Sequence, residues 1–208
     1  MEIAVLRNGL FESNTWLVGE AGCCTVIDCG APASDILAAA ERMGCRITHI
    51  VLTHGHLDHV CQAEALVEAT GAPLCLHEGE KALYVDPDAS GFSTFGIPRS
   101  RTFPMPDRLL RDGEVLETGG PSFRVIHTPG HTSGCICLLA DGHLFSGDTL
   151  FHRGVGRTDL ATGDAGKLVR SLRETLYRLA PETVVHPGHG PDTTIGQEAA
   201  RNPHITAK

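Results

Sequence analysis

The sequence predicts an α/β fold in which two mixed sheets pack face to face and helices cover their outer faces. Each half of the chain contains a series of strand patterns followed by helical patterns, and this order supports the prediction. No short-period repeat and no linker divides the 208 residues. An apolar content of 41% is sufficient for the core of a two-layer structure. We therefore expect a single domain over residues 1–208.

The first half is expected to fold as a hairpin followed by alternating strands and helices. These elements are predicted over residues 2–6, 13–18, 23–28, 34–43, 47–52, 60–70, 72–77 and 78–84. Asn8-Gly9 is typical of a hairpin turn between the first two strands. Ser34 is a candidate N-cap of the first helix, and Gly44 is typical of its end.

Residues 86–106 interrupt this order, because glycines and prolines recur throughout the segment. Phe92, Phe95 and Phe103 are spaced with neither a helical nor a strand period. Long loops inside compact domains are usually functional or disordered. Two interpretations remain open: an ordered flap that packs over substrate, and a loop that only covers the core.

The second half repeats the order of strands followed by a helix. Strands are predicted over residues 108–110, 114–117, 123–127, 135–139, 143–146 and 183–186. Asp141-Gly142 is a hairpin signal between two of these strands. A helix is predicted where leucines recur at helical spacing, at Leu168, Leu172, Leu176 and Leu179.

The loop after the strand at 47–52 carries His54, His56, Asp58 and His59 within six positions. Imidazole nitrogen suits zinc, iron and nickel, and carboxylate oxygen suits harder ions. Because this loop joins a strand to a helix, its side chains can point into one cavity. The cluster therefore predicts a metal site.

Three further ligand-type residues follow strands in the second half. They are His131 in Pro-Gly-His-Thr, Asp148 in Ser-Gly-Asp-Thr and His189 in Pro-Gly-His-Gly. A glycine precedes each of them and lets the backbone turn tightly. Residues at strand ends converge on one edge of a sheet sandwich, so we expect these three near the histidine-rich loop. His127 is a weaker candidate, since it lies within its strand.

Charge and cysteine content exclude several classes of function. A net charge of −8 without a run of Lys or Arg disfavours nucleic acid and anionic membranes as partners. No segment approaches the roughly 20 apolar residues of a membrane span, and the first apolar run is too short for a signal peptide. We therefore expect a cytoplasmic protein. Its eight cysteines are expected to be reduced thiols, most of them in the core, and Cys61, just past the metal loop, is the one weak candidate for metal contact.

Taken together, the motifs resemble the metallo-β-lactamase superfamily, and within it the single-domain glyoxalase II-like hydroxyacylglutathione hydrolases. The resemblance rests on His-x-His-x-Asp-His, Pro-Gly-His-Thr, Gly-Asp-Thr-Leu-Phe and Pro-Gly-His-Gly. It covers nearly the whole chain, including residues 95–98, 106–108, 154–159 and 189–196. It implies an αββα metallo-β-lactamase-type sandwich of two mixed sheets with helices on the outer faces, in agreement with the predicted elements.

The resemblance also implies a centre of two divalent metal ions. The first ion would be held by His54, His56 and His131, the second by Asp58, His59 and His189, and both by Asp148. Zinc is the favoured metal, and iron or manganese are alternatives. Zinc lowers the pKa of bound water from about 15.7 to about 7. A metal-bound hydroxide could therefore act as the nucleophile, with Asp58 orienting it.

The reaction implied by this resemblance is hydrolysis of a thioester, above all an S-(2-hydroxyacyl)glutathione such as S-lactoylglutathione. A thiolate is a good leaving group, so no strong general acid is needed. Longer glyoxalase II enzymes carry Gly-x-Gly-Lys and two aromatic residues that contact glutathione. Here Arg157 keeps the charge and would bind substrate, while Asp159 replaces an aromatic residue; pairing of these two is the alternative. The chain ends at Lys208, so we expect no C-terminal glutathione-binding domain.

Other members of the superfamily offer alternative functions. A persulfide dioxygenase would hold one iron through His54, His131 and Asp148 and also shows Gly-Arg-Thr-Asp. True class B β-lactamases usually carry Cys or Ser in place of Asp148, and ribonuclease-type members usually carry extra segments that bind nucleic acid. A non-catalytic domain is disfavoured, since no ligand position is lost. The expected partner is a small-molecule thioester, without nucleic acid or membrane, and the oligomeric state stays open.

Overall fold

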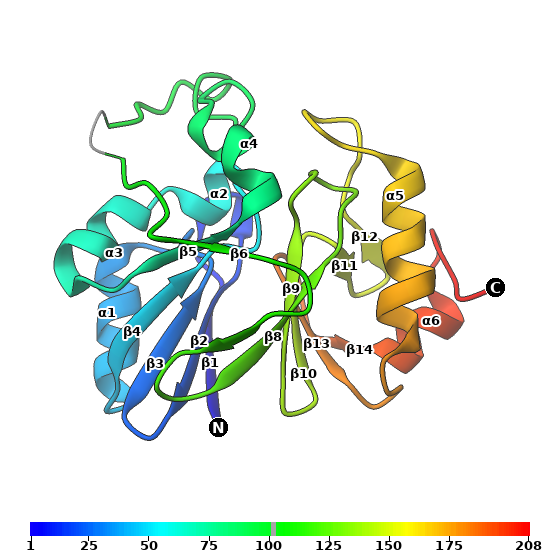
Figure 1. The fold of residues 1–208 in the computed structure, drawn as a ribbon, viewed down its shortest axis with the longest axis horizontal. Helices are drawn as coiled ribbons and strands as arrows, with labels where there is room; N and C mark the ends of the chain where they lie inside the picture. The colour runs from blue at the N-terminus through cyan, green and yellow to red at the C-terminus, as the bar shows by residue number, and fades with distance from the viewer. Residues whose placement is uncertain (101–102) are drawn as a thin grey trace.

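The computed structural model describes residues 1–100 and 103–208, and it contains the two predicted sheets (Figure 1). Within these ranges each sheet has six strands, in the orders β1-β2-β3-β4-β5-β6 and β14-β13-β10-β9-β8-β7. The first sheet comprises β1 (Glu2–Leu6), β2 (Thr15–Glu20), β3 (Cys23–Ile27), β4 (Arg46–Val51), β5 (Leu74–His77) and β6 (Arg108–Leu110). The second comprises β7 (Val115–Glu117), β8 (Ser122–His127), β9 (Ile136–Ala140), β10 (His143–Gly147), β13 (Val184–Pro187) and β14 (Thr193–Thr194). A small ribbon pairs β11 (Leu150–Phe151) with β12 (Gly154–Val155).

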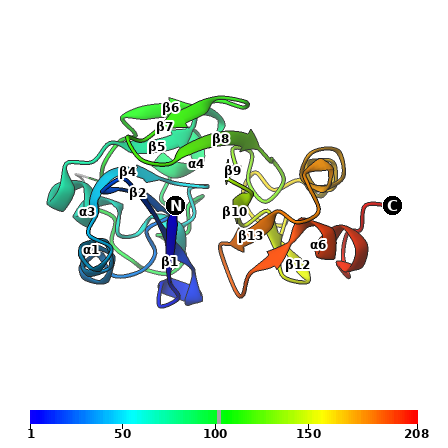
Figure 2. The ribbon, with the colours of Figure 1, turned by 90° about the horizontal axis from the view of Figure 1, so that it is seen from below.

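Both sheets are mixed, and helices cover their outer faces. In the first sheet β3, β4, β5 and β6 run parallel, while β1 and β2 are antiparallel additions. In the second sheet β10 and β13 are parallel and the other neighbours are antiparallel. Helices α1 (Ala33–Arg42) and α3 (Ala63–Thr70) lie outside the first sheet, and α5 (Ala165–Arg170) and α6 (Ile195–Arg201) lie outside the second (Figures 1 and 2). The predicted αββα sandwich is confirmed.

The apolar core lies in three layers, as this architecture requires. One cluster fills the space between the sheets and includes Trp16, Phe123 and Phe145. A second packs α1 and α3 against the first sheet, and a third packs the last helices against the second sheet. The leucine spacing is confirmed, because Leu168 and Leu172 are both buried in the third layer. Each buried leucine contributes about 1.5–3 kcal/mol, so this stripe holds the helix on the sheet.

The helices differ in detail from the sequence prediction. The leucine-rich helix continues from α5 through a π segment (Ser171–Thr175) into a 3-10 turn (Leu176–Arg178). The helix predicted over 60–70 is divided into α2 (Leu57–Val60) and α3. Its predicted end is confirmed by Gly71, which has a φ of 64°. The sequence analysis did not anticipate α6. None of the helices in the described ranges combines the length and apolarity that crossing a bilayer requires.

Two turns in the second half connect their strands in different ways. Asp141 and Gly142 have φ values of 45° and 79° and close the β9–β10 hairpin, as predicted. By contrast, residues 111–114 do not join neighbouring strands of one sheet. Strand β6 pairs with β5 and strand β7 pairs with β8, so this turn carries the chain from the first sheet to the second.

The predicted Asn8-Gly9 hairpin turn is wrong. Strands β1 and β2 do pair, but residues 7–14 connect them through a 3-10 turn, η1 (Leu10–Glu12). Gly9 has a φ of −67°, outside the left-handed region that a tight Asn-Gly turn requires. The longer connection places Ser13 and Asn14 against the loops that carry the metal-ligand candidates.

Candidate metal centre

Four loops bring the seven predicted ligands to one end of the sandwich. The loop after β4, with α2, carries four of them, and the loops after β8, β10 and β13 carry one each. All seven side chains are buried or half-buried: His54, His56, Asp58, His59, His131, Asp148 and His189. Six of them form two groups whose candidate ligand atoms lie within 4.8 Å of one another.

The first group consists of His54, His56 and His131. His56 Nδ1 lies 2.8 Å from His131 Nε2. His131 Nδ1 donates to the carbonyl oxygen of Arg157 at 2.8 Å, which leaves Nε2 facing the group. His54 Nδ1 lies 3.0 Å from Thr53 Oγ1, and its buried Nε2 has no hydrogen-bond partner within the described ranges. A buried polar atom without a partner is costly, and a cation at this position would satisfy it.

The second group consists of Asp58, His59 and His189. Asp58 Oδ2 lies 3.0 Å from His189 Nε2 and 3.4 Å from His59 Nε2. These atoms are spaced as ligands of one ion would be, with two nitrogens and one oxygen facing a common point. The group therefore offers a second position for a divalent cation.

Asp28 orients His59 from outside the predicted ligand set. Its Oδ2 accepts hydrogen bonds from His59 Nδ1 and from the Thr53 hydroxyl, and its Oδ1 accepts one from the backbone amide of Thr53, each at 2.8 Å. Its backbone φ of 59° is unusual for a non-glycine residue. The sequence places Asp28 at the end of the strand predicted over residues 23–28 and gives no sign of a role at the metal site. Fixing Nδ1 of a histidine directs Nε2 toward a ligand site, which is how metal-binding histidines are commonly oriented.

Asp148 lies between the two groups. Its Oδ1 is 3.4 Å from His59 Nε2, and its Oδ2 is 3.7 Å from the Nε2 atoms of both His131 and His189. Gly188 permits this arrangement, because a Cβ at that position would lie 2.2 Å from Asp148 Oδ1. Asp148 thus faces both groups, with Oδ2 equally far from a histidine of each group, as a bridging carboxylate would.

Burial dominates the electrostatics of the first group. It lowers the pKa of His54 well below its usual value, and lowers the pKa of His56 to about 4. The neighbouring histidines add to the shift of His54. Both side chains are therefore neutral at pH 7, the state in which imidazole binds a metal.

Carboxylates dominate the second group. Burial lowers the pKa of His59, but Asp58, Asp148 and Asp28 outweigh it and raise that pKa well above its usual value. Burial lowers the pKa of His189, but its hydrogen bond to Asp58 and the charges of Asp148 and Asp58 together outweigh burial and raise that pKa. Burial raises the pKa of Asp58, but the two histidines outweigh it and the net shift is downward. Without metal this group holds protons, and a bound cation would take their place.

A buried carboxylate, Glu80, ties the loops of the first group together. It accepts hydrogen bonds from the amide of Gly55 at 2.9 Å, and from the Thr132 hydroxyl and the Gly134 amide at 2.8 Å each. Its side chain is fully buried, and burial raises its pKa. Because Gly55 separates His54 from His56 and Thr132 follows His131, Glu80 fixes both loops relative to each other.

Five of the seven metal-ligand candidates line a cleft of about 460 Å³, namely His56, Asp58, His131, Asp148 and His189. Arg157 lines this cleft, and its guanidinium makes two hydrogen bonds of 2.7 Å with the carboxylate of Asp159. The pairing considered as an alternative from sequence is therefore present in the structure. Its carbonyl oxygen meanwhile holds His131, a contact that no sequence signal marks.

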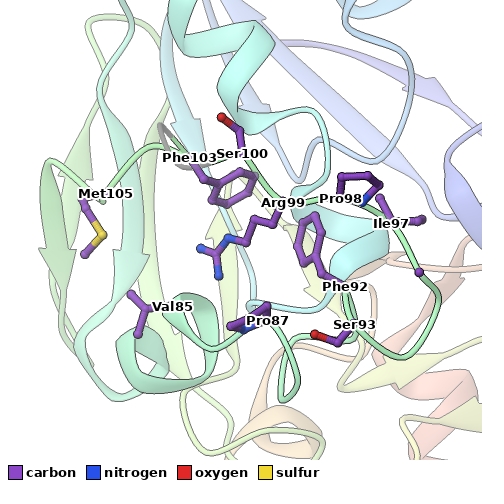
Figure 3. Close-up of a pocket in the computed structure, with 11 residues that line it drawn as sticks. Val85, Pro87, Phe92, Ser93, Ile97, Pro98, Arg99, Ser100, Phe103 and Met105 are labelled. Carbon is purple, nitrogen blue, oxygen red and sulfur yellow. The ribbon is translucent and has the colours of Figure 1, made fainter.

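The three phenylalanines of residues 86–106 have different positions. Phe92 and Phe103 pack against the first core layer, and their edge-to-face rings lie 5.5 Å apart. Figure 3 shows the Arg99 side chain between these two rings, in a cavity of about 540 Å³ that none of the seven metal-ligand candidates lines. Phe95 instead lines the metal cleft. The loop therefore covers part of the core through Phe92 and Phe103, and its packing over substrate stays a prediction; residues 101–102 lie outside the described residues.

Two weaker sequence candidates lie away from the two groups. The ring of His127 stacks on His77 at 4.2 Å, and its Nε2 donates to the carbonyl oxygen of Ser133. Cys61 Sγ lies 3.7 Å from the carbonyl oxygen of Gly30. Neither residue belongs to a candidate metal group within the described part of the chain.

Known proteins of similar sequence and structure share this arrangement of strands and loops. The family model described as the Metallo-beta-lactamase superfamily matches residues 8–191. The hydroxyacylglutathione hydrolase GloC of Haemophilus influenzae is 35% identical over 214 residues, which cover 100% of both chains. A solved structure of TTHA1623 in a di-iron-bound form is 37% identical, with a TM-score of 0.87 and coverage of 97% of this chain and 100% of that one.

Two further solved structures are similar over almost the whole chain. BLEG-1, a B3 metallo-beta-lactamase, is 33% identical, with a TM-score of 0.92 and coverage of 99% of this chain and 100% of that one. ETHE1 from Myxococcus xanthus is 29% identical, with a TM-score of 0.80 and coverage of 100% of this chain and 86% of that one.

Proposed function

We propose, on the premise that this chain belongs to the metallo-beta-lactamase superfamily, that it is a metal-dependent hydrolase whose substrate is a thioester. The observation that carries the proposal is the pair of three-residue groups at the cleft, with Asp148 between them. Six candidate ligand atoms in two groups match two ions better than one. A carboxylate that faces both groups matches a bridging ligand.

The donor set fits divalent metal ions. Nitrogen and carboxylate oxygen donors suit zinc, iron and manganese. Two buried atoms of this donor set lack hydrogen-bond partners in the described structure, namely His54 Nε2 and Asp148 Oδ1, and a bound cation would satisfy them. We assign His54, His56 and His131 to one ion and Asp58, His59 and His189 to the other. Zinc is favoured, and iron is the principal alternative, since the TTHA1623 structure is a di-iron form.

Such ions, when bound, lower the pKa of water and polarise a carbonyl group. The chain supplies the geometry. Asp28 and the Arg157 carbonyl hold His59 and His131 in single orientations, so little reorganisation accompanies binding. Asp58 remains ionised because its pKa is lowered, so it can accept a hydrogen bond from an attacking water and orient it.

A thioester is the proposed substrate class, and S-lactoylglutathione is the proposed representative. The name of the GloC relative, which matches over its whole length, supports this choice. The leaving thiolate requires no strong general acid. This suits the site, because Asp58 has a lowered pKa, stays ionised and so cannot donate a proton to a leaving group. Arg157 lines the cleft and, once released from its pair with Asp159, could contact an anionic thiol such as glutathione.

A persulfide dioxygenase is the second candidate. The similarity to ETHE1 favours it, and that reaction would use one iron held by His54, His131 and Asp148. The complete second group of Asp58, His59 and His189 favours the hydrolase.

The test is hydrolysis of S-lactoylglutathione by wild-type protein and by the Asp148→Asn variant. Wild type purified without chelator should release thiol at a rate that chelation abolishes and added metal restores. The variant should retain its fold and lose at least about 100-fold in kcat/KM, because one bridging charge is removed. No release of thiol by metal-loaded wild type would refute the proposed function.

A further inference from the structure

The mouth of the metal cleft has an apolar rim formed by Phe11, Phe95 and Leu160. These side chains are 50%, 57% and 41% exposed, and all three line the cleft that contains the metal-ligand candidates. The rings of Phe11 and Phe95 contact each other, with centroids 4.7 Å apart and an angle of 54° between their planes. The three residues come from three separate segments of the chain, so local sequence does not explain why they meet.

Such a grouping needs a cause. Large apolar side chains scattered singly over a surface are ordinary, whereas grouped ones beside a cleft are typical of binding sites. Exposed large hydrophobic residues also occur elsewhere: Val85 and Met105 line the Arg99 cavity, and Leu109 on β6 lines neither that cavity nor the metal cleft. The rim is therefore distinguished by its convergence on the metal centre.

Phe11 is held in the rim against its own backbone preference. Its φ of 55° and the 60° of Glu12 place two consecutive non-glycine residues in the left-handed region. Such backbone strain persists only where surrounding contacts fix it, and it concentrates at functional sites. Here the Ser13 hydroxyl donates to the carbonyl oxygen of Asp58 at 2.7 Å. The backbone amide of Asn14 donates to the carbonyl oxygen of Gly188, also at 2.7 Å. The position of Phe11 is thus fixed to two of the loops that carry metal-ligand candidates.

Phe95 is connected to the same loops through a different segment of the chain. The amide of Leu57, at the start of α2, donates to the carbonyl oxygen of Ser90 at 2.8 Å. The Phe95 amide donates to the carbonyl oxygen of Gly91 at 3.1 Å, which closes a turn beneath its ring. The aromatic pair is therefore anchored to the metal loops through both of its members.

We propose that this rim binds the acyl part of the substrate and selects acyl groups with an apolar substituent larger than the methyl group of lactate. The inference rests on the proposed thioester hydrolysis. In that reaction the thiol part is polar and has Arg157 as its charged contact, which leaves the apolar rim for the acyl part. The expected substrates are thioesters of 2-hydroxy acids with aliphatic or aryl side chains.

The experiment compares glutathione thioesters of lactate, 2-hydroxybutanoate, 2-hydroxyhexanoate and mandelate with metal-loaded protein. In wild type, kcat/KM should rise about twofold to fourfold per added methylene, the range between half and full burial. Phe95→Ala should flatten this dependence, and Phe95→Leu should restore part of it. Leu109→Ala, which removes a comparably exposed side chain far from the cleft, should leave the series unchanged.

A binding measurement keeps this inference separate from the proposed function. The dissociation constants of the free 2-hydroxy acids, measured by calorimetry, should fall along the same series in wild type but not in Phe95→Ala. If no thioester is hydrolysed but this trend is present, the proposed reaction fails and the apolar rim stands. Equal affinities across the acids, or a dependence that Phe95→Ala leaves intact, would overturn the rim assignment.

Discussion

His59 is the residue on which the charges of the centre converge. It is fully buried, and three carboxylates surround it: Asp58, Asp148 and Asp28. No other histidine of the two groups is held in this way at both ring nitrogens by carboxylates in the described structure. Its substitution therefore tests the second metal position most sharply.

His59→Ala is expected to lose the metal of the second group and to reduce kcat/KM by about 100-fold or more, while the fold survives. The packed core does not depend on metal as a small zinc finger does. Elemental analysis, thioester hydrolysis and thermal unfolding measure the three effects. His204→Ala, at an exposed position, is the matched control. Unchanged metal content and turnover in His59→Ala would contradict the assignment.

The charge on His59 should also appear in the stability of the metal-free protein. Its folded pKa is raised above the usual value near 6.5, so its pairing with carboxylates stabilises the fold fully below about pH 6.5. This contribution is lost as the pH rises through the raised pKa. The difference in unfolding free energy between wild type and His59→Gln, measured in urea after chelation, should therefore shrink with rising pH. A difference that grows with pH would show that the charged state of His59 is wrongly assigned.

At the scale of elements, the centre depends on loops that belong to different sheets. The loop after β4 leaves the first sheet, and the loops after β8, β10 and β13 leave the second. Glu80, in the short turn η2 (Glu78–Glu80), joins the β4 loop to the β8 loop through three hydrogen bonds. Metal binding in the first group should therefore depend on a residue that does not touch the metal.

Glu80→Gln tests this connection. Both carboxylate oxygens of Glu80 accept hydrogen bonds, and the glutamine side chain replaces one of these oxygens by an NH2 group, which cannot accept. At least one hydrogen bond is therefore lost, at a cost of about 1–3 kcal/mol in unfolding free energy. We expect metal affinity to fall by about tenfold to 100-fold, as for other residues that support ligands indirectly. Glu78→Gln, an exposed position in the same turn that pairs with Arg111, is the control. Equal metal affinity in the two variants would contradict a role for Glu80 in metal binding by the first group.

Sequence reasoning reached the fold and the approach of the seven ligand candidates because both leave local patterns. Strand and helix periods, and histidines placed at strand ends beside glycines, are visible in short windows. The supporting roles of Asp28 and Glu80 were not predicted, because their hydrogen-bond partners lie far along the chain and no sequence spacing indicates them. The Asn8-Gly9 turn failed for a related reason. Contacts of Ser13 and Asn14 with distant loops override the local preference for a tight hairpin.

At the scale of the whole molecule, the number of bound metal ions per chain is the first testable quantity. Two complete groups and a carboxylate between them predict about two divalent ions per chain. Protein purified without chelator and analysed for metals gives this ratio directly. A firm value of one iron per chain, with the second group empty, would contradict the two-metal assignment and favour the dioxygenase.

The central claim is that this metal centre hydrolyses thioesters. The most direct measurement places one metal-loaded sample in parallel assays with S-lactoylglutathione, with glutathione persulfide under oxygen, and with a cephalosporin as the β-lactam control. We expect kcat/KM for thiol release from the thioester to exceed kcat/KM for oxygen consumption with the persulfide and for opening of the lactam ring. Oxygen consumption or lactam hydrolysis at a higher kcat/KM than thioester cleavage would contradict it.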